Sequence, residues 1–131
     1  MRISRLLIVT VFAGVFPILA CSDSTSATPV GKVSVQVQDS NNAGVPLVNV
    51  DLYKVLGGGV VLWRASRTSS DGVAIFGETG GGIDAGAYSI HVSFITNYQL
   101  APGETNDKPV TVQGGDSVGV TFHVVTNHPG L

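Results

Sequence analysis

The strongest limit on how this chain folds is a strict alternation of apolar and polar side chains that starts near residue 31 and recurs downstream. Val33, Val35 and Val37 alternate with polar residues at positions 34, 36 and 38. Successive side chains of a β-strand point to opposite faces, so this pattern is typical of a strand with one buried face. After position 20, no window of eleven residues carries an apolar stripe at helical spacing. The pattern therefore predicts an all-β fold.

Seven strands are predicted, and each interval between them carries turn chemistry. Glycine, asparagine, aspartate and serine gather in these intervals and favour turns. The interval 39–44 is expected to close a hairpin between the first two strands. Seven short antiparallel strands favour a two-sheet sandwich of the immunoglobulin-like or prealbumin-like kind. The expected strands are 33–38, 48–53, 60–65, 73–76, 87–94, 110–113 and 118–125.

Four of these strands are expected to supply most of the core. Each large apolar side chain that is fully buried stabilises a fold by about 1.5–3 kcal/mol. The chain holds one cysteine, so the core must suffice without an internal disulfide. The expected core residues are Val33, Val35, Val37, Val48, Val50, Leu52, Tyr88, Ile90, Val92, Phe94, Val120, Phe122 and Val124.

The first 20 residues have the pattern of a secretory leader. Arg2 and Arg5 precede an uncharged run of fifteen residues, 6–20. A basic start, an apolar middle and a small residue before a cleavage site are typical of a signal peptide. A bilayer-spanning helix needs roughly 20 apolar residues, and this run is shorter and contains Gly14 and Pro17. Residues 1–20 are therefore predicted to be removed.

The segment Ile18, Leu19, Ala20 and Cys21 resembles the bacterial lipobox, which implies that Cys21 becomes the lipidated first residue of the mature protein. A lone thiol in an exported chain has no internal disulfide partner, and acylation accounts for it. Each buried methylene of an acyl chain contributes about 0.8 kcal/mol, so two or three chains give a stable membrane anchor. The alternative is an ordinary cleaved signal with an incidental cysteine.

The remaining chain divides into a tether, one domain and a short tail. Residues 21–30 are rich in serine and threonine and predict a flexible tether, 31–126 hold the sandwich, and 127–131 form the tail. Ser22, directly after the cysteine, resembles an outer-membrane sorting signal, which implies the periplasmic face or the cell surface. Without the leader the chain has 5 basic and 9 acidic residues, a net charge of −4. This balance argues against nucleic-acid binding, which requires clustered cations.

The order and spacing of several segments are similar to carboxypeptidase-regulatory-like and Cna B-type sandwiches, which have a transthyretin-like architecture. The resemblance spans roughly residues 31–125 and implies an accessory module without catalytic activity. Function does not follow from this fold alone. The segments that carry the resemblance are 31–33, Asp39, 44–50, 68–76 and 86–90.

Cna B-type domains often contain an isopeptide crosslink between a lysine and an asparagine, promoted by an acid. The resemblance places Val37 at the lysine position and Val92 at the acid position, and only Asn127 lies near the expected asparagine. Without an amine nucleophile or an acid, we predict no crosslink.

The sequence offers no catalytic or metal-binding constellation. His91 and His123 occupy outward positions of predicted strands, and His128 lies in the tail. None has the spacing of a metal-ligand motif, so all three are expected to be surface residues, and no cofactor is predicted. No serine stands in a nucleophile elbow. A hydrolase would require His91, His123 and an acid to share one cleft, and we expect no enzyme.

Trp63 and Tyr98 are the candidate ligand-binding residues. Segment 60–64 is apolar on both phases, so either Trp63 or Leu62 faces outward or is covered by a loop. We expect Trp63 in the core; an exposed Trp63 would instead stack on a sugar or anchor a protein. Tyr98 and the polar loop 101–109 offer a second recognition edge. The sequence thus predicts a lipid-anchored, non-catalytic module that contacts an envelope protein or polysaccharide, with carbohydrate binding as the alternative.

Overall fold

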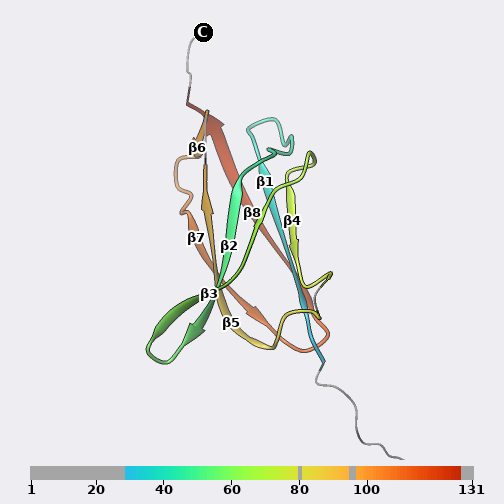
Figure 1. Cartoon of the computed structure of the whole chain (residues 1–131). Helices are drawn as coiled ribbons and strands as arrows, with labels where there is room; N and C mark the ends of the chain where they lie inside the picture. Colours follow the sequence, from blue (N-terminus) through green and yellow to red (C-terminus); the bar gives the residue numbers. More distant parts are fainter. Residues whose placement is uncertain (1–28, 80, 95–96, 128–131) are drawn as a thin grey trace, which may run out of the picture.

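The computed structural model describes residues 29–79, 81–94 and 97–127, and every helix or strand element in this part is a β-strand. Two four-stranded sheets, with the orders β4-β1-β8-β6 and β3-β2-β5-β7, form the two layers of a sandwich (Figure 1). The predicted all-β, two-sheet architecture is confirmed. The strands are β1 (Lys32–Gln38), β2 (Asn49–Leu56), β3 (Gly59–Arg67), β4 (Val73–Phe76), β5 (Gly86–Ser93), β6 (Tyr98–Leu100), β7 (Asp107–Val112) and β8 (Ser117–Thr126).

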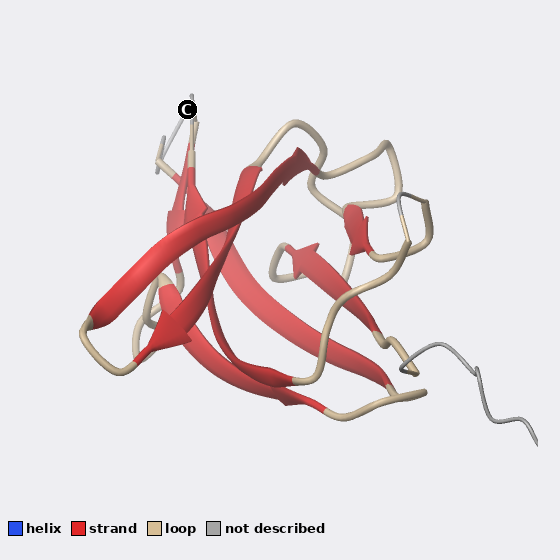
Figure 2. Cartoon of the chain, turned by 60° about the horizontal axis from the view of Figure 1, so that its bottom comes forward, coloured by secondary structure: helices blue, strands red, loops and turns tan. Residues whose placement is uncertain are grey.

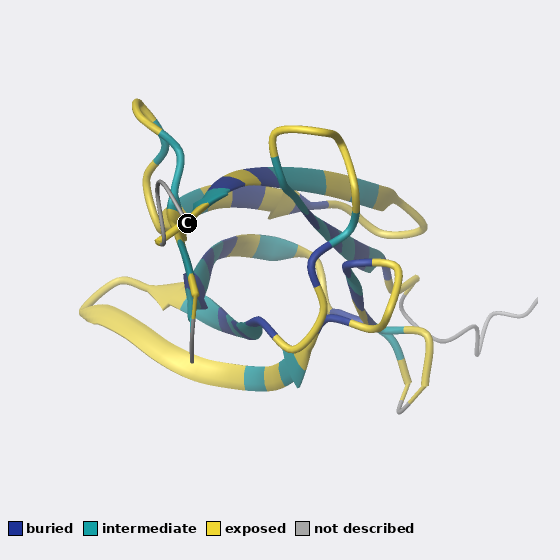
Figure 3. Ribbon diagram, turned by 90° about the horizontal axis from the view of Figure 1, so that it is seen from above, coloured by how far each residue is buried: buried dark blue, intermediate teal, exposed yellow. Residues whose placement is uncertain are grey.

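The core lies between the two sheets, as the buried residues in Figure 3 show. The valines of β1 are completely buried, and the polar residues between them are partly exposed. All predicted core residues are buried except Phe94 and Val120, which are partly buried and pack against the same cluster. The core also contains residues that the alternation did not reveal: Val45, Ala74, Phe76, Ile83, Val110 and Val112.

Two features of the predicted topology are wrong. The first two strands do not form a hairpin, because β1 pairs antiparallel with β4 and parallel with β8, whereas β2 lies in the other sheet. There are eight strands in the described residues, not seven. The additional strand, β6, has three residues and is too short to show an alternation.

The strand predicted at 110–113 begins earlier, at Asp107. Asp107, Lys108 and Pro109 have the composition of a loop, so the sequence pattern alone places them in the polar loop before the strand. Proline is tolerated here because β7 is an edge strand, where a missing N–H leaves no ladder partner unpaired.

A buried threonine, Thr68, stabilises the connections that lead from one sheet to the other. The Thr68 hydroxyl donates a hydrogen bond to the Val45 carbonyl at 2.7 Å and accepts one from the Val48 N–H at 3.0 Å. Thr68 is 2% exposed. Its side chain thus satisfies backbone groups where the chain leaves one sheet for the other.

Two loops meet closely beside this crossover. A Cβ atom on Gly44 would lie 2.0 Å from the Asp71 carbonyl oxygen. Gly72 has a φ of 77°, which favours glycine, and a Cβ atom on it would lie 2.5 Å from the Gly44 Cα. The two glycines therefore allow the loop after β1 and the turn before β4 to pack against each other.

The predicted signal peptide, Cys21 and His128 lie outside the described residues. In the part of the chain that the structure describes, no helix is long and apolar enough to cross a bilayer.

Candidate interaction surface

The outer half of the β2–β3 hairpin extends away from the body of the sandwich (Figures 1 and 2). Leu56 pairs with Gly59 across a tight turn made by Gly57 and Gly58. Along β2, burial alternates up to Leu52; the next two residues are partly buried and the last two, Val55 and Leu56, are exposed. The opposite sheet therefore covers only the part of the hairpin in which the first half of β2 pairs with the second half of β3.

The projecting end presents large apolar side chains on both faces, and Figure 3 shows the exposed residues of β3. Soluble monomers rarely expose a contiguous apolar patch of this kind, and such patches mark interaction sites. We call the following residues, with their exposed fractions, the apolar hairpin: Val55 (41%), Leu56 (49%), Val60 (57%), Val61 (49%), Leu62 (52%) and Trp63 (40%).

Trp63 is exposed, so the expectation that it lies in the core is wrong. Leu52 pairs with Arg64 and Tyr53 pairs with Leu62, which leaves Trp63 as the extra residue of a β-bulge. The Lys54 ammonium lies 4.7 Å from the centre of its ring. Because that ammonium is also 3.9 Å from Asp84, one side of the Trp63 ring faces a charged pair.

Tyr98, the other candidate ligand-binding residue, lies in the opposite sheet. It begins β6, is partly buried, and packs against the core cluster. Its carbonyl oxygen accepts a hydrogen bond of 3.2 Å from the Asn127 side chain. Trp63 and Tyr98 are therefore not neighbouring parts of one aromatic platform.

The residues at the predicted crosslink positions also have clear places. Val37 and Val92 are buried aliphatic side chains of the core. The amide nitrogen of Asn127 is engaged with Tyr98. The absence of a crosslink remains a prediction.

The two described histidines belong to different sheets and do not share a cleft. His91 Nδ1 lies 2.9 Å from Asp107 Oδ1 on the outer face of β5 and β7. His123 Nδ1, on β8, lies 3.9 Å from Glu104 Oε1, and this histidine side chain is 51% exposed. In the described residues, no group of three or more His, Cys, Asp or Glu residues has the arrangement of a metal site.

Glu104 joins the loop before β7 to β8. Its carboxylate accepts a hydrogen bond of 2.9 Å from the His123 backbone N–H and one of 3.0 Å from the Lys108 ammonium. Burial raises the pKa of this carboxyl, but the hydrogen bonds and the positive charge of Lys108 outweigh it and hold the pKa below its ordinary value. The Lys108 ammonium also donates to the Thr121 carbonyl at 2.6 Å, which binds the two sheets together.

Tyr88 closes the sandwich beside the apolar hairpin. Its hydroxyl donates a 2.8 Å hydrogen bond to the Asp84 carbonyl oxygen. Burial and the neighbouring Asp84 carboxylate raise the pKa of this phenol, and the Arg64 charge opposes them. The group therefore acts as a neutral hydrogen-bond donor at physiological pH.

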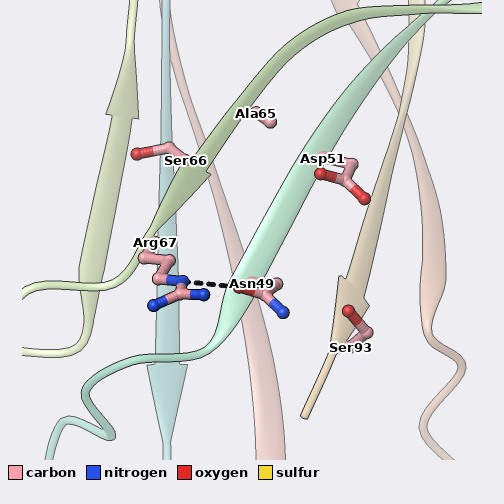
Figure 4. Close-up of a pocket in the computed structure, with 6 residues that line it drawn as sticks. All are labelled: Asn49, Asp51, Ala65, Ser66, Arg67 and Ser93. Carbon is pink, nitrogen blue, oxygen red and sulfur yellow. Dashed lines mark hydrogen bonds between the residues drawn. The ribbon is translucent and has the colours of Figure 1, made fainter. Parts of the chain in front are cut away.

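The outer face of the β3-β2-β5-β7 sheet carries two shallow hollows. One, of about 390 Å³, has a polar rim in which Arg67 Nε donates a 2.8 Å hydrogen bond to Asn49 (Figure 4). The other, of about 460 Å³, borders the apolar hairpin at Val60 and is otherwise lined by Tyr53, Ser89, His91 and Asp107. Neither combines an activated nucleophile with a base, so the apolar hairpin is the more distinctive surface.

No family model matches this sequence, and no curated protein matches it. Several solved structures share its fold. An ancillary pilin of Streptococcus has a TM-score of 0.59 at 16% identity, with 83% of this chain and 36% of that chain covered. The minor pilin of Streptococcus agalactiae has a TM-score of 0.58 at 16% identity, with 79% and 48% covered. The TIE protein of Bacillus anthracis has a TM-score of 0.57 at 15% identity, with 75% and 17% covered.

These likenesses show a pilin-like β-sandwich and support the Cna B-type fold expected from the sequence. The chain spans about half or less of the length of these structures. At such low identity the likeness concerns the fold alone.

Most of the apolar hairpin is not predicted to be a surface from its sequence. Trp63 stands out, but the apolar run beside it is typical of a strand with at least one covered side. The signal was present: a run without alternation that follows three glycines, 57–59. Such a run is consistent with a strand buried on both faces or with an uncovered edge strand, and the sequence does not place the opposite sheet.

Proposed function

We propose that this protein is a lipid-anchored, non-catalytic module of the bacterial cell envelope that docks on a protein partner through the apolar hairpin. The observation that carries the proposal is the exposure of large apolar side chains on both faces of β3. Covering these side chains would remove apolar surface from water, which is the dominant favourable contribution to protein association.

The anchor rests on the sequence. The leader-like residues 1–20, the lipobox-like segment and the unpaired Cys21 together support export and lipidation. The Ser/Thr-rich tether would keep the domain near the membrane. We place the protein at the outer membrane, on its periplasmic face or at the cell surface, and we retain the carboxypeptidase-regulatory-like assignment as part of this proposal.

The pilin-like fold supports a structural role. Two of the similar structures are named as pilins, one ancillary and one minor. For this chain we infer a comparable task, in which the sandwich is a rigid body and the hairpin makes the contact.

Carbohydrate binding is the alternative that the structure favours less. Sugar-binding surfaces use exposed aromatic rings together with polar groups. Trp63 and Tyr98 lie in opposite sheets, and the Lys54 ammonium occupies a position over the Trp63 ring. The exposed side chains that precede Trp63 along β3 are valines and a leucine, which suit a protein surface better than a glycan.

Lipid anchoring at Cys21 and docking through the apolar hairpin can be tested separately in cells. Replacing Cys21 with alanine is expected to move the protein from the membrane fraction to the soluble fraction; retention in the membrane would contradict the anchor. A photo-crosslinking amino acid at Leu62 is expected to give adducts of higher mass, whereas the same group at Ile75, which is 40% exposed on β4, is expected to give none. Equal labelling from both positions would contradict docking through the hairpin.

A further inference from the structure

The four edge strands of the two sheets differ in how they discourage pairing with another chain. β4 has four residues and β6 has three, so each offers a short template. β7 carries Pro109, which lacks a donor, beside two charged residues. Short strands, prolines and charges are the usual means of protecting a sheet edge. Three of the four edges are therefore protected.

The fourth edge, β3, lacks these protections along its first half. It has nine residues and contains no proline, lysine or acid. From Gly59 to Trp63 it is uncharged, and its regular pairing with β2 continues up to the bulge at Trp63. This segment, 59–63, presents unpaired backbone groups together with side chains that are exposed on both faces.

We propose that segment 59–63 of β3 pairs antiparallel with the same segment of a second copy of this chain, about a two-fold axis at Val61. The inference rests on the proposed function, because it names the protein partner of the apolar hairpin. A two-fold contact uses the same patch on both subunits, so the patch must be complementary to itself.

The order of residues around Val61 meets this condition. Val60 of one copy stands opposite Leu62 of the other, on one face of the joined sheet. Gly59 stands opposite Trp63 on the other face, where the large ring covers backbone that a glycine leaves bare. Opposed apolar and aromatic side chains stabilise antiparallel pairs.

The charges near the segment select this register. With the axis at Val61, Arg64 of one copy lies opposite Gly58 in the turn of the other, so no like charges meet. An axis at Arg64 would place two guanidinium groups opposite each other, which is destabilising. The β3-β2-β5-β7 sheets of the two copies would then form one continuous sheet, with β3 and its copy at the centre.

Disulfide trapping in membranes tests the contact and its register with the full chain. Val61→Cys is expected to form a disulfide-linked dimer on mild oxidation, because the two thiols face each other across the axis. The wild-type chain, whose only cysteine is Cys21, measures the background, and Ile75→Cys is the control at a similarly exposed position. We expect dimer from Val61→Cys at several times the level of both.

The register is tested by mixing two single-cysteine variants that differ in tag. Val60→Cys with Leu62→Cys is expected to give the mixed dimer, and Val60→Cys alone is expected to give little dimer because its two thiols lie on a diagonal. Equal yields would overturn the proposed register.

The outcomes separate this inference from the proposed function. If Val61→Cys yields no dimer while the photo-crosslinker at Leu62 captures a different protein, the second copy is wrong and docking through the hairpin stands. If neither position yields a product above the Ile75 controls, both proposals are wrong. If Val61→Cys yields the homodimer and the photo-crosslinker at Leu62 captures a second copy of this chain, both proposals are supported; adding Val61→Lys is then expected to abolish the Leu62 adduct.

Discussion

The two ends of the β2–β3 ladder have similar composition and opposite surroundings. At one end Val50 and Leu52 lie under the other sheet and are completely buried. At the other end Leu56 and Val61 lie on the same face of the ladder but beyond that sheet, and each is 49% exposed. The same kinds of side chain therefore stabilise the fold at one end and remain available to a partner at the other.

This difference shows what alternation in a strand reports. A strand that alternates has one side against a layer of its own protein and one side in water. A strand that is apolar on both sides needs two covering layers, and β3 has neither at its projecting end. In our account a partner outside the domain therefore supplies the apolar contacts that these side chains lack within it.

The largest expected effect contrasts two leucines on neighbouring strands. Leu52→Ala is expected to lower the free energy of unfolding by about 2–5 kcal/mol, because it opens a cavity in a packed core. Leu62→Ala, at an exposed position, is expected to change it by about 0.5 kcal/mol or less. Chemical denaturation of both variants in dilute solution measures the difference. Equal losses would mean that the apolar hairpin belongs to the core.

Two glycines sharpen the same contrast through the backbone. Gly44→Ala is expected to lower the free energy of unfolding by about 1–3 kcal/mol, because its Cβ would meet the Asp71 carbonyl oxygen. Gly58→Ala, in the hairpin turn, has no heavy atom within 4 Å of the added Cβ. Thermal unfolding should therefore separate the two variants clearly. A tolerated Gly44→Ala would contradict the close approach of the two loops.

Thr68 tests whether hydrogen bonding fixes the body at the point where the chain changes sheets. Thr68→Val is expected to lower the free energy of unfolding by about 1–3 kcal/mol, because it leaves the buried Val45 carbonyl and Val48 N–H without their partner. Thr105→Val removes an exposed hydrogen bond to the Asp107 carbonyl and serves as the control. Denaturation of the two variants under the same conditions makes the comparison. A loss as small for Thr68 as for Thr105 would contradict the role of the hydroxyl.

The smallest effect is expected from Glu104→Gln, and it concerns how the free energy of unfolding depends on pH. Because its pKa is lower in the folded state than the ordinary value of 4.5, its ionised form adds stability above that value. This contribution is lost as the pH falls through the lowered pKa. Unfolding measured from pH 6 downward should therefore be less pH-dependent in Glu104→Gln than in the wild type.

Glu78→Gln is the matched control for the acid range. Glu78 is 58% exposed and its carboxylate lies 3.9 Å from the Lys32 ammonium, so this substitution should change the free energy of unfolding by about 0.5 kcal/mol or less. A Glu104→Gln profile identical to that of the wild type would mean that the contacts with Lys108 and His123 do not stabilise the fold.

The sequence predicted the layers of this fold better than their connections. Alternation in residues 33–37 and 48–52 identified buried faces, because side-chain direction in a strand depends only on local geometry. The partner of β1 depends on contacts distant in sequence, so its parallel pairing with β8 was not predicted. β6 was missed because three residues hold too little pattern.

The apolar hairpin was predicted only in part, because its exposure also depends on residues distant in sequence. Trp63 stood out as an unusual residue, but its exposure depends on where the opposite sheet ends and on the bulge beside Leu62. The Glu104 contacts join residues on separate elements, and no local sequence motif predicts them. Exposure of β3 is therefore a property of the assembled sandwich rather than of its own segment.

Fluorescence of Trp63 tests the central claim most directly, because it is the chain's one tryptophan. In dilute protein we predict emission typical of a water-exposed indole and strong quenching by iodide. When the protein is in its membrane at native density, emission should shift to shorter wavelength and quenching should fall. A tryptophan that is already shielded in the dilute protein, or one that stays equally accessible in the membrane, would contradict docking through the apolar hairpin.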